Sequence, residues 1–256
     1  MTEPTRHFWE IFFEVFEALP RQGPGDRTST AGALALCDGL PSAPSILDLG
    51  CGVGAQTLHL AELTDGSIVA VDNHAPFIDR LGVVAAERGL AIRIRPLLAD
   101  MAAAGLPPAS FDLVWSEGAL YQLGLDAALR LCADLLRPGG YLAFTDAVWR
   151  RDDPPAEVRA SFDGDYPAMG SVDDVVAVIV RSGLELVDHF TLRDEAWWHD
   201  FYTPLQARVR ELRGIHAADP EALEVLDQLD AETEMRRRYG GYYAYEFFVA
   251  RRAATS

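Results

Sequence analysis

Cysteine is scarce in this chain of 256 residues, which holds only three. Cys37, Cys51 and Cys132 are far apart, odd in number and without a C-x-x-C spacing. Such a pattern indicates neither a disulfide framework nor a zinc site, so we expect no bound metal. Unpaired thiols fit a reducing compartment, and we expect a cytoplasmic protein.

Basic residues are also few, because 22 lysines and arginines stand against 39 aspartates and glutamates, a formal net charge of −17. A surface this acidic repels phosphate backbones and anionic lipids. We therefore expect no nucleic-acid partner and no membrane docking. A small-molecule substrate is the simplest interpretation, and a monomer and a homodimer both stay open.

Long apolar runs are absent as well. No uninterrupted stretch approaches the roughly 20 residues of a transmembrane helix. The apolar stretch near the N-terminus carries Glu10, Glu14 and Glu17, so it is not typical of a signal peptide. Hydrophobic residues make up 49% of the chain, which supports the core of one large α/β domain over residues 1–256 rather than two independent domains.

Glycine, in contrast, is concentrated in one informative place, the stretch 46–54 with the sequence ILDLGCGVG. A short apolar strand there runs into a turn with Gly50, Gly52 and Gly54, and a helix with an apolar face follows. This geometry places backbone N–H groups and a positive helix end beside a polar ligand. Glycine suits a turn with positive φ that a ligand approaches closely.

The spacing of these glycines predicts the kind of ligand. They alternate strictly, whereas a dinucleotide site needs G-x-G-x-x-G, so an NAD(P)-dependent oxidoreductase is disfavoured. Asp48 would repel a pyrophosphate and attract an ammonium group. The turn therefore predicts a nucleoside that carries an amino-acid or cationic tail. A glycine-rich turn without any ligand is the alternative.

The string from Asp48 to Gly54 resembles the first motif of the class I S-adenosylmethionine (SAM)-dependent methyltransferases. Asp72 ends the next apolar run, where an acid can accept hydrogen bonds from both ribose hydroxyls, although a helix N-cap is an alternative role. The resemblance implies that Asp100 binds the adenine amine and that Met101 packs on its ring. Residues 135–141, Leu-Leu-Arg-Pro-Gly-Gly-Tyr, contain a further feature of this class.

The resemblance extends over about residues 45–146 and, more weakly, over the last two strands. It implies an α/β, Rossmann-like fold with a seven-stranded sheet of order 3-2-1-4-5-7-6 and strand 7 antiparallel. Residues 22–25, 115–119 and the tryptophan-rich stretch look like a bacterial subgroup of small-molecule methyltransferases, similar to methyltransferase type 11. The fourth strand lacks the Asn/Asp-Pro-Pro-Tyr end of enzymes that methylate bases or glutamine amides.

Two helical segments are expected outside the sheet: an N-terminal segment, 1–44, and an insertion, 194–240, between strands six and seven. The helix at 7–19 has an aromatic face that could either close over the site as a lid or simply pack as core. We expect a helix from Pro220 to Tyr239, and a loop or broken helix over 150–170. The strands that follow the glycine turn are expected at 67–72, 91–95, 111–115, 141–146, 183–190 and 242–251.

The resemblance implies SAM as cofactor and S-adenosylhomocysteine (SAH) as product. The residues expected to bind the cofactor lie at the glycine turn and at successive strand ends. They are Asp48, Gly50, Cys51, Gly52, Gly54, Gln56, Asp72, Asn73, Asp100, Met101, Ser116 and Glu117.

Methyl transfer is an in-line displacement that needs alignment, exclusion of water and sometimes a base. Glu117, His199 and Asp146 are the candidate bases, and each has a structural alternative; Glu117 could instead bind the ammonium group of the cofactor. Five aromatic residues are expected to line a pocket for an apolar or cationic substrate, or else to pack in the insertion. They are Tyr121, Trp149, Trp197, Trp198 and Tyr202.

The sequence therefore predicts a SAM-dependent methyltransferase of a small molecule, with the acceptor atom (O, N, S or C) open. Two alternatives share every cofactor residue. One is a non-catalytic protein that binds and senses SAM, and the other is an enzyme that uses the same nucleoside for a different group transfer.

Overall fold

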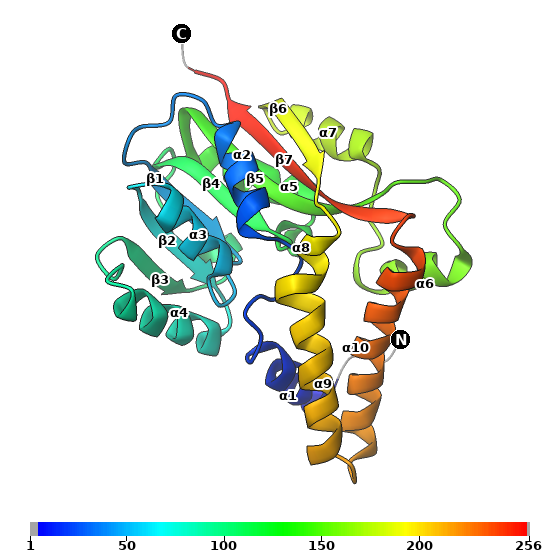
Figure 1. Ribbon diagram of the computed structural model, residues 1–256. Helices are drawn as coiled ribbons and strands as arrows, with labels where there is room; N and C mark the ends of the chain where they lie inside the picture. The colour runs from blue at the N-terminus through cyan, green and yellow to red at the C-terminus, as the bar shows by residue number, and fades with distance from the viewer. Residues whose placement is uncertain (1–4, 255–256) are drawn as a thin grey trace.

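The computed structural model describes residues 5–254, so the first four and the last two residues of the expected segments lie outside it. Seven strands form one sheet in the order β3-β2-β1-β4-β5-β7-β6 (Figure 1). β7 is antiparallel to both of its neighbours, and the other pairs are parallel. The strands are β1 (Ser45–Leu49), β2 (Ser67–Asp72), β3 (Ile94–Leu98), β4 (Phe111–Glu117), β5 (Leu136–Trp149), β6 (Leu184–Thr191) and β7 (Tyr243–Arg252). The predicted strand order and the antiparallel last strand are confirmed.

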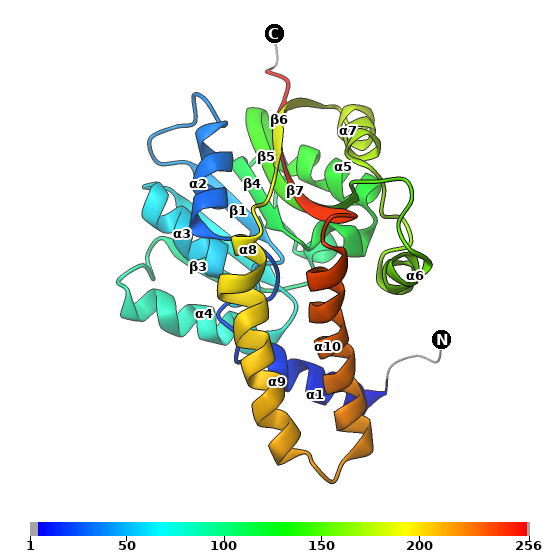
Figure 2. The same ribbon diagram turned by 45° about the vertical axis from the view of Figure 1, so that its right-hand side comes forward.

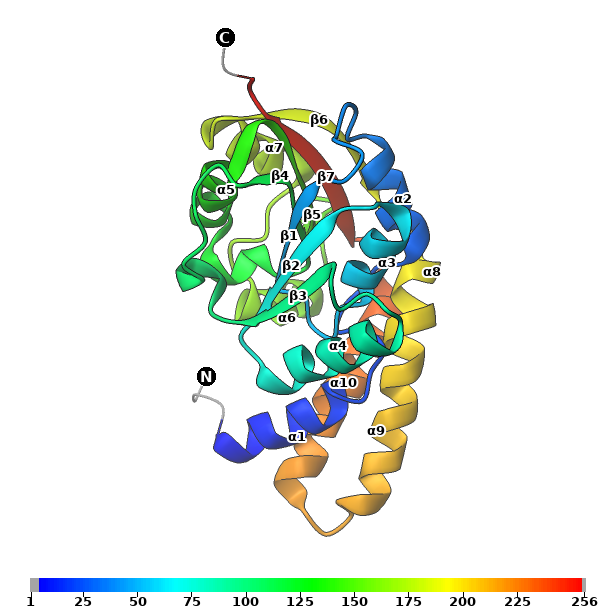
Figure 3. The ribbon, with the colours of Figure 1, turned by 90° about the vertical axis from the view of Figure 1, so that its left-hand side faces the viewer.

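Helices cover both faces of this sheet, which is why its central strands are apolar on both sides. One face carries α2 (Arg27–Ala35), α3 (Ala55–Leu63) and α4 (Ala75–Glu87), and the other carries α5 (Leu125–Leu135) and α7 (Val172–Arg181), as Figure 3 shows. Short 3₁₀ turns, η1 (Met101–Ala103) and η2 (Leu120–Leu123), follow β3 and β4. The carboxyl ends of the parallel strands are left for other segments to cover.

Those segments are α1 (Arg6–Phe16) and the insertion between β6 and β7 (Figure 2). The insertion consists of α8 (Glu195–Trp197), a π-helical turn η3 (Trp198–Tyr202), α9 (Thr203–Ile215) and α10 (Pro220–Tyr239). α1 packs against both long helices of the insertion. One apolar cluster joins these helices to Val53 in the glycine turn and to Phe77 in α4.

Three local expectations differ from the structure. β3 begins at Ile94 rather than at residue 91, because the amides of Arg93 and Ile94 both bond back to the carbonyl of Leu90 in a turn. β5 begins at Leu136 rather than at residue 141, because it already pairs with Phe111 there. It continues to Trp149, because it stays paired with β7 as far as Tyr243. The stretch 150–170 contains a continuous helix, α6 (Ala156–Asp165).

Over residues 5–254, none of the helices combines the length and the apolar character that a bilayer-spanning segment requires.

Candidate functional site

The glycine turn has the backbone geometry that its sequence predicts. Gly50, Gly52 and Gly54 all have positive φ, at 71°, 54° and 85°. A Cβ atom on Gly50 would lie 2.3 Å from the Cβ of Ala119, so a side chain has no room there. The amides of Gly50 and Cys51 donate to the carbonyl of Val71 at 2.8 and 2.9 Å, which ties the turn to the end of β2.

Asp48 lies beneath this turn and is fully buried. Its carboxylate accepts hydrogen bonds from the Thr57 hydroxyl at 2.5 Å and from the Gln56 amide at 3.3 Å. Gln56 also donates to the carbonyl of Cys51 at 3.2 Å. Burial raises the pKa of Asp48 to about 7. Asp48 and Gln56 therefore hold the turn from inside, and their direct contact with a ligand stays a prediction.

Three of the other expected cofactor residues gather around the turn. Asp72, at the end of β2, is half-buried and accepts the amides of Gly52 and His74, each at 2.9 Å. Met101 places its Cε atom 3.7 Å from the position of a Cβ on Gly50. Asp100 is exposed and accepts the amide of Ala102 at 2.8 Å, which caps η1. Asn73, next to Asp72, is also exposed.

The Gly- and Pro-rich loop between α1 and α2 contacts the glycine turn, although none of its residues was among the expected site residues. The amide of Val53 donates to the side-chain oxygen of Gln22 at 2.9 Å. The nitrogen of the same side chain donates to the carbonyl of Phe16 at 3.1 Å, so Gln22 links the turn to α1. The Gly- and Pro-rich break at residues 20–26 was the available signal, but it does not show which residue of the loop makes contact.

Glu117 belongs to a buried ion pair with Arg21 from that loop. The side chain of Glu117 is 0% exposed and that of Arg21 is 5% exposed. Glu117 also accepts the indole N–H of Trp115 at 2.8 Å and the hydroxyl of Thr30 at 3.4 Å. Nη1 of Arg21 is buried and has no hydrogen-bond partner within residues 5–254. This guanidinium therefore keeps a donor for an anionic group.

Ser116, adjacent to Glu117, is also buried. Its hydroxyl donates to the carbonyl of Leu49 at 2.7 Å and so joins β4 to β1. The structure therefore gives Ser116 a bond between strands, and its contact with the cofactor stays a prediction.

A second set of side chains lies near the carboxyl ends of β4 and β5. Asp146 is 2% exposed and accepts the Tyr166 hydroxyl at 2.8 Å. Burial raises the pKa of Asp146 to about 7. The ring of Tyr121 lies 5.1 Å from that of Tyr166. Trp149 donates its indole N–H to the carbonyl of Met169 at 2.9 Å.

Two aromatic residues of the insertion, Trp197 and Tyr202, pack between α10 and β7. Trp197 is buried, with its ring 5.1 Å from that of Tyr245. Tyr202 is also buried and donates to the carboxylate of Glu232 in α10 at 2.9 Å. The ring of Tyr245 lies 3.2 Å from the position of a Cβ on Gly118, directly after Glu117. Tyr245 therefore connects the aromatic residues to the glycine-turn region.

His199 and Trp198 lie apart from these groups. The side chain of His199 is 84% exposed and pairs with its neighbour Asp200 at 2.7 Å. Trp198 is half-buried and donates to Asp194 at 3.1 Å. Of the three candidate bases, only Asp146 is thus buried beside aromatic residues without a cationic partner in the described residues.

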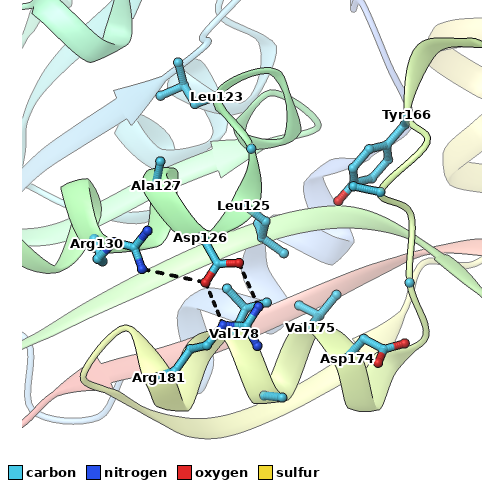
Figure 4. Close-up of a pocket in the computed structure, with 14 residues that line it drawn as sticks. Leu123, Leu125, Asp126, Ala127, Arg130, Tyr166, Asp174, Val175, Val178 and Arg181 are labelled. Carbon is cyan, nitrogen blue, oxygen red and sulfur yellow. Dashed lines mark hydrogen bonds and ion pairs between the residues drawn. The ribbon is translucent and has the colours of Figure 1, made fainter.

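A surface cleft of about 530 Å³ lies elsewhere, between α5 and α7 (Figure 4). Asp126 there holds Arg181 through two bonds of 2.6 and 2.7 Å. Tyr166 also lines this cleft, but none of the expected cofactor residues does. The glycine turn, rather than this cleft, carries the chemistry that the sequence predicts.

Known proteins resemble this chain over the same region. Residues 46–140 match a family model described as a methyltransferase domain. A SAM-dependent methyltransferase from Geobacter sulfurreducens, solved with SAH, superposes with a TM-score of 0.80 at 22% identity, covering 94% of this chain and 97% of that one. A putative sarcosine dimethylglycine methyltransferase from Galdieria sulphuraria gives 0.75 at 20% identity, covering 97% and 99%.

Two curated relatives add sequence similarity. Sterol 24-C-methyltransferase erg-4 of Neurospora crassa is 25% identical over 229 residues, which cover 82% of this chain and 60% of that protein. Dimethylglycine N-methyltransferase of Parasynechococcus marenigrum is 35% identical over 124 residues, covering 48% and 44%. The chain thus spans less than two thirds of the length of these relatives.

Proposed function

We propose that this chain, which carries a methyltransferase domain on the class I fold, transfers a methyl group from SAM to a small-molecule acceptor. The observation that carries the proposal is the glycine turn, with positive φ at Gly50, Gly52 and Gly54 and with Asp72 bonded to its Gly52 amide. We also propose the cytoplasm of a bacterial cell as its location, and the three free, buried cysteines fit the reducing compartment that the cytoplasm provides.

The side chains around the turn suit the parts of this cofactor. Each oxygen of Asp72 accepts one amide and has a further lone pair for a ribose hydroxyl. Met101, above Gly50, offers an apolar surface to adenine, beside Asp100. The free Nη1 of Arg21 fits the carboxylate of the amino-acid tail, and Glu117 beside it fits the ammonium group.

The cofactor, when bound, supplies an activated methyl group and its leaving group. The protein then has to orient the acceptor and exclude water. The N-terminal segment 1–44 would act as a lid and the insertion 194–240 as a cap. Asp146 is the favoured base among the three expected candidates, because its pKa of about 7 suits proton acceptance near neutral pH. Glu117 is held by Arg21, and His199 faces solvent.

Calorimetry with SAM and SAH tests the proposal. The wild-type protein should bind both, and Asp72→Ala should weaken binding at least tenfold, because hydrogen bonds to a charged group contribute about 1.5–3 kcal/mol. Asp65→Ala, at an exposed position in the loop after α3, is the matched control. Undetectable binding by the wild-type protein would refute the proposal. Incubation with labelled SAM and a metabolite extract should then label a small molecule.

A further inference from the structure

A cluster of tyrosines and carboxyl groups lies where the insertion meets the ends of β4, β5 and β7. We call it the tyrosine–carboxylate cluster, and its members are Tyr121, Tyr166, Tyr202, Tyr245, Asp146 and Glu232. Tyr166 donates to Asp146, and its ring lies 5.1 Å from that of Tyr121. Tyr202 donates to Glu232, and the ring of Trp197 lies within about 6 Å of those of Tyr202 and Tyr245. Tyr245 in turn contacts Gly118, so the cluster borders the proposed cofactor site.

Neither carboxyl group of the cluster is paired with a cation. The side-chain partner of Asp146 is the Tyr166 hydroxyl, and that of Glu232 is the Tyr202 hydroxyl. Within residues 5–254, no arginine or histidine forms an ion pair with either of them. Asp146 is buried, and burying a carboxylate without a cation is costly, so a cationic ligand would stabilise the cluster.

Glu232 keeps accessible surface, although its carboxylate accepts the Tyr202 hydroxyl. Tyr121 and Tyr245 are likewise only partly covered. Three members of the cluster therefore keep surface that a ligand can contact.

Two further features mark the region as a binding site. The indole N–H of Trp197 is buried without a partner in the described chain, and its ring lies 6.0 Å from that of Tyr202 and 5.1 Å from that of Tyr245. Tyr202 itself lies on the π-helical turn η3. π-helical turns are rare and occur frequently at functional sites.

We propose that the methyl acceptor is a small amine, bound as a cation between Glu232 and the rings of Tyr121, Tyr202 and Tyr245, and methylated on nitrogen. Tyrosine faces attract cations, and the carboxylate supplies the missing counter-charge. This inference rests on the proposed function, because it identifies the acceptor of the same reaction. A hydrogen-bond acceptor elsewhere on the amine would satisfy the N–H of Trp197.

The reaction balances with these groups. For an amine held at Glu232, the carboxylate of that residue, rather than that of Asp146, takes a proton from the bound ammonium. This frees the nitrogen lone pair. That pair forms the bond to the methyl carbon while the carbon–sulfur bond breaks and its electrons stay on sulfur as a thioether. The products are the methylated ammonium and SAH, and Glu232 later releases its proton to solvent.

A binding comparison tests the charge preference without any variant. Choline and its neutral isostere 3,3-dimethylbutan-1-ol have nearly the same shape, and each is titrated into the SAH-loaded protein by calorimetry. Choline should bind at least tenfold more tightly, because desolvated cation–π contacts and a carboxylate favour only the cation. Equal affinities, or no binding of choline while SAH still binds, would overturn the inference and leave the proposed function standing.

A variant and a turnover assay complete the test. Glu232→Gln should weaken choline binding at least tenfold without changing SAH affinity, whereas Glu224→Gln, at an exposed position of the same helix, should change neither. With labelled SAM, a panel of small primary and secondary amines should accept label and the matched alcohols should not. Label that appeared on alcohols alone would refute the inference that the methyl acceptor is an amine. Absence of SAH binding would instead refute the proposed function.

Discussion

Arg21 is a residue whose role depends on a single unsatisfied atom. Its Nε donates to the carbonyl of Gly23 at 2.9 Å, its Nη2 pairs with Glu117, and its buried Nη1 has no partner within the described residues. Buried donors are rarely left unpaired in native proteins, so such an atom indicates a ligand group. The cofactor carries one carboxylate, on its amino-acid tail, and we assign Nη1 to it.

The assignment predicts a selective loss of affinity. Arg21→Ala should weaken SAH binding at least tenfold, because a charge-assisted hydrogen bond contributes about 1.5–3 kcal/mol. Binding of 5′-methylthioadenosine, which lacks the amino-acid tail, should change much less. Arg27→Ala, which removes an exposed arginine paired with Glu62, serves as control. Equal losses for both ligands in calorimetry would show that Arg21 only supports the fold.

At the scale of elements, α1 is attached to the rest of the molecule by three histidine–carboxylate pairs. His7 contacts Asp219 at 2.8 Å, and His216 contacts Glu14 at 2.9 Å. His74 contacts Glu17 at 2.8 Å and stacks on Phe13, with the ring centroids 3.8 Å apart. These pairs connect α1 to both ends of the α9–α10 turn and to the start of α4.

Removing one pair should loosen α1 without unfolding the sheet. His216→Gln should accelerate amide hydrogen exchange in α1 several-fold at fixed pH, whereas His199→Gln, at the exposed end of the insertion, should not. Unchanged amide hydrogen exchange in α1 of the His216→Gln variant would show that the His216–Glu14 pair does not hold this helix.

The hydrogen bonds to Asp219 and Glu10 raise the pKa of His7. The contribution of His7 to the stability of the folded state is therefore full below its ordinary pKa of 6.5, and it is lost as pH rises through the raised pKa.

Local signals explain why many elements were predictable. Asp219 caps α10 by accepting the amide of Ala222, and Pro220 then starts the helix, so its bounds follow from adjacent residues. Apolar runs likewise predicted the strands at 67–72 and 111–115, whereas the sheet order was implied by the family resemblance. The extension of β5 depended instead on β7, about a hundred residues later, which no local pattern encodes.

The same limit applies to the site. The turn was predictable, because glycine is the residue type that favours the positive φ observed at its three positions. Arg21, Gln22 and Glu232 reach their partners only through tertiary packing, and each partner lies about 30 or more residues away along the chain. Their residue types and spacing carry no sign of these contacts. Sequence patterns thus predicted the glycine turn but not the groups that pack around it.

The whole molecule should respond to pH through its buried carboxyl groups. Burial raises the pKa of Asp48 from 3.8 to about 7, and that of Asp146 similarly. Their contribution to the free energy of unfolding is therefore full below pH 3.8 and is lost as pH rises through about 7. Paired surface acids such as Asp126, whose pKa is lowered by Arg181, lose their contribution only below that range.

Denaturant titrations should consequently show that the free energy of unfolding falls between about pH 4 and 7. Asp48→Asn removes one of the two groups. The free energy of unfolding of this variant should therefore fall less steeply with pH than that of the wild-type protein. Asp65→Asn, at an exposed position, should leave the slope unchanged. A parallel curve for Asp48→Asn would mean that Asp48 does not titrate in this window.

The contacts of Gln22 also connect cofactor binding to closure of the whole molecule. Its side chain bridges the Val53 amide in the glycine turn and the Phe16 carbonyl at the end of α1. α1 in turn packs on α9 and α10, so a ligand that orders the turn should order these helices as well. SAH should therefore slow hydrogen exchange in α1, in residues 20–26 and in α9 and α10, while α7 and β6 serve as an internal reference. Gln22→Ala should keep protection at the turn but lose it in α1, because the bridge is the connection between them. Equal protection of α1 with and without SAH in the wild-type protein would contradict a lid that closes on the cofactor.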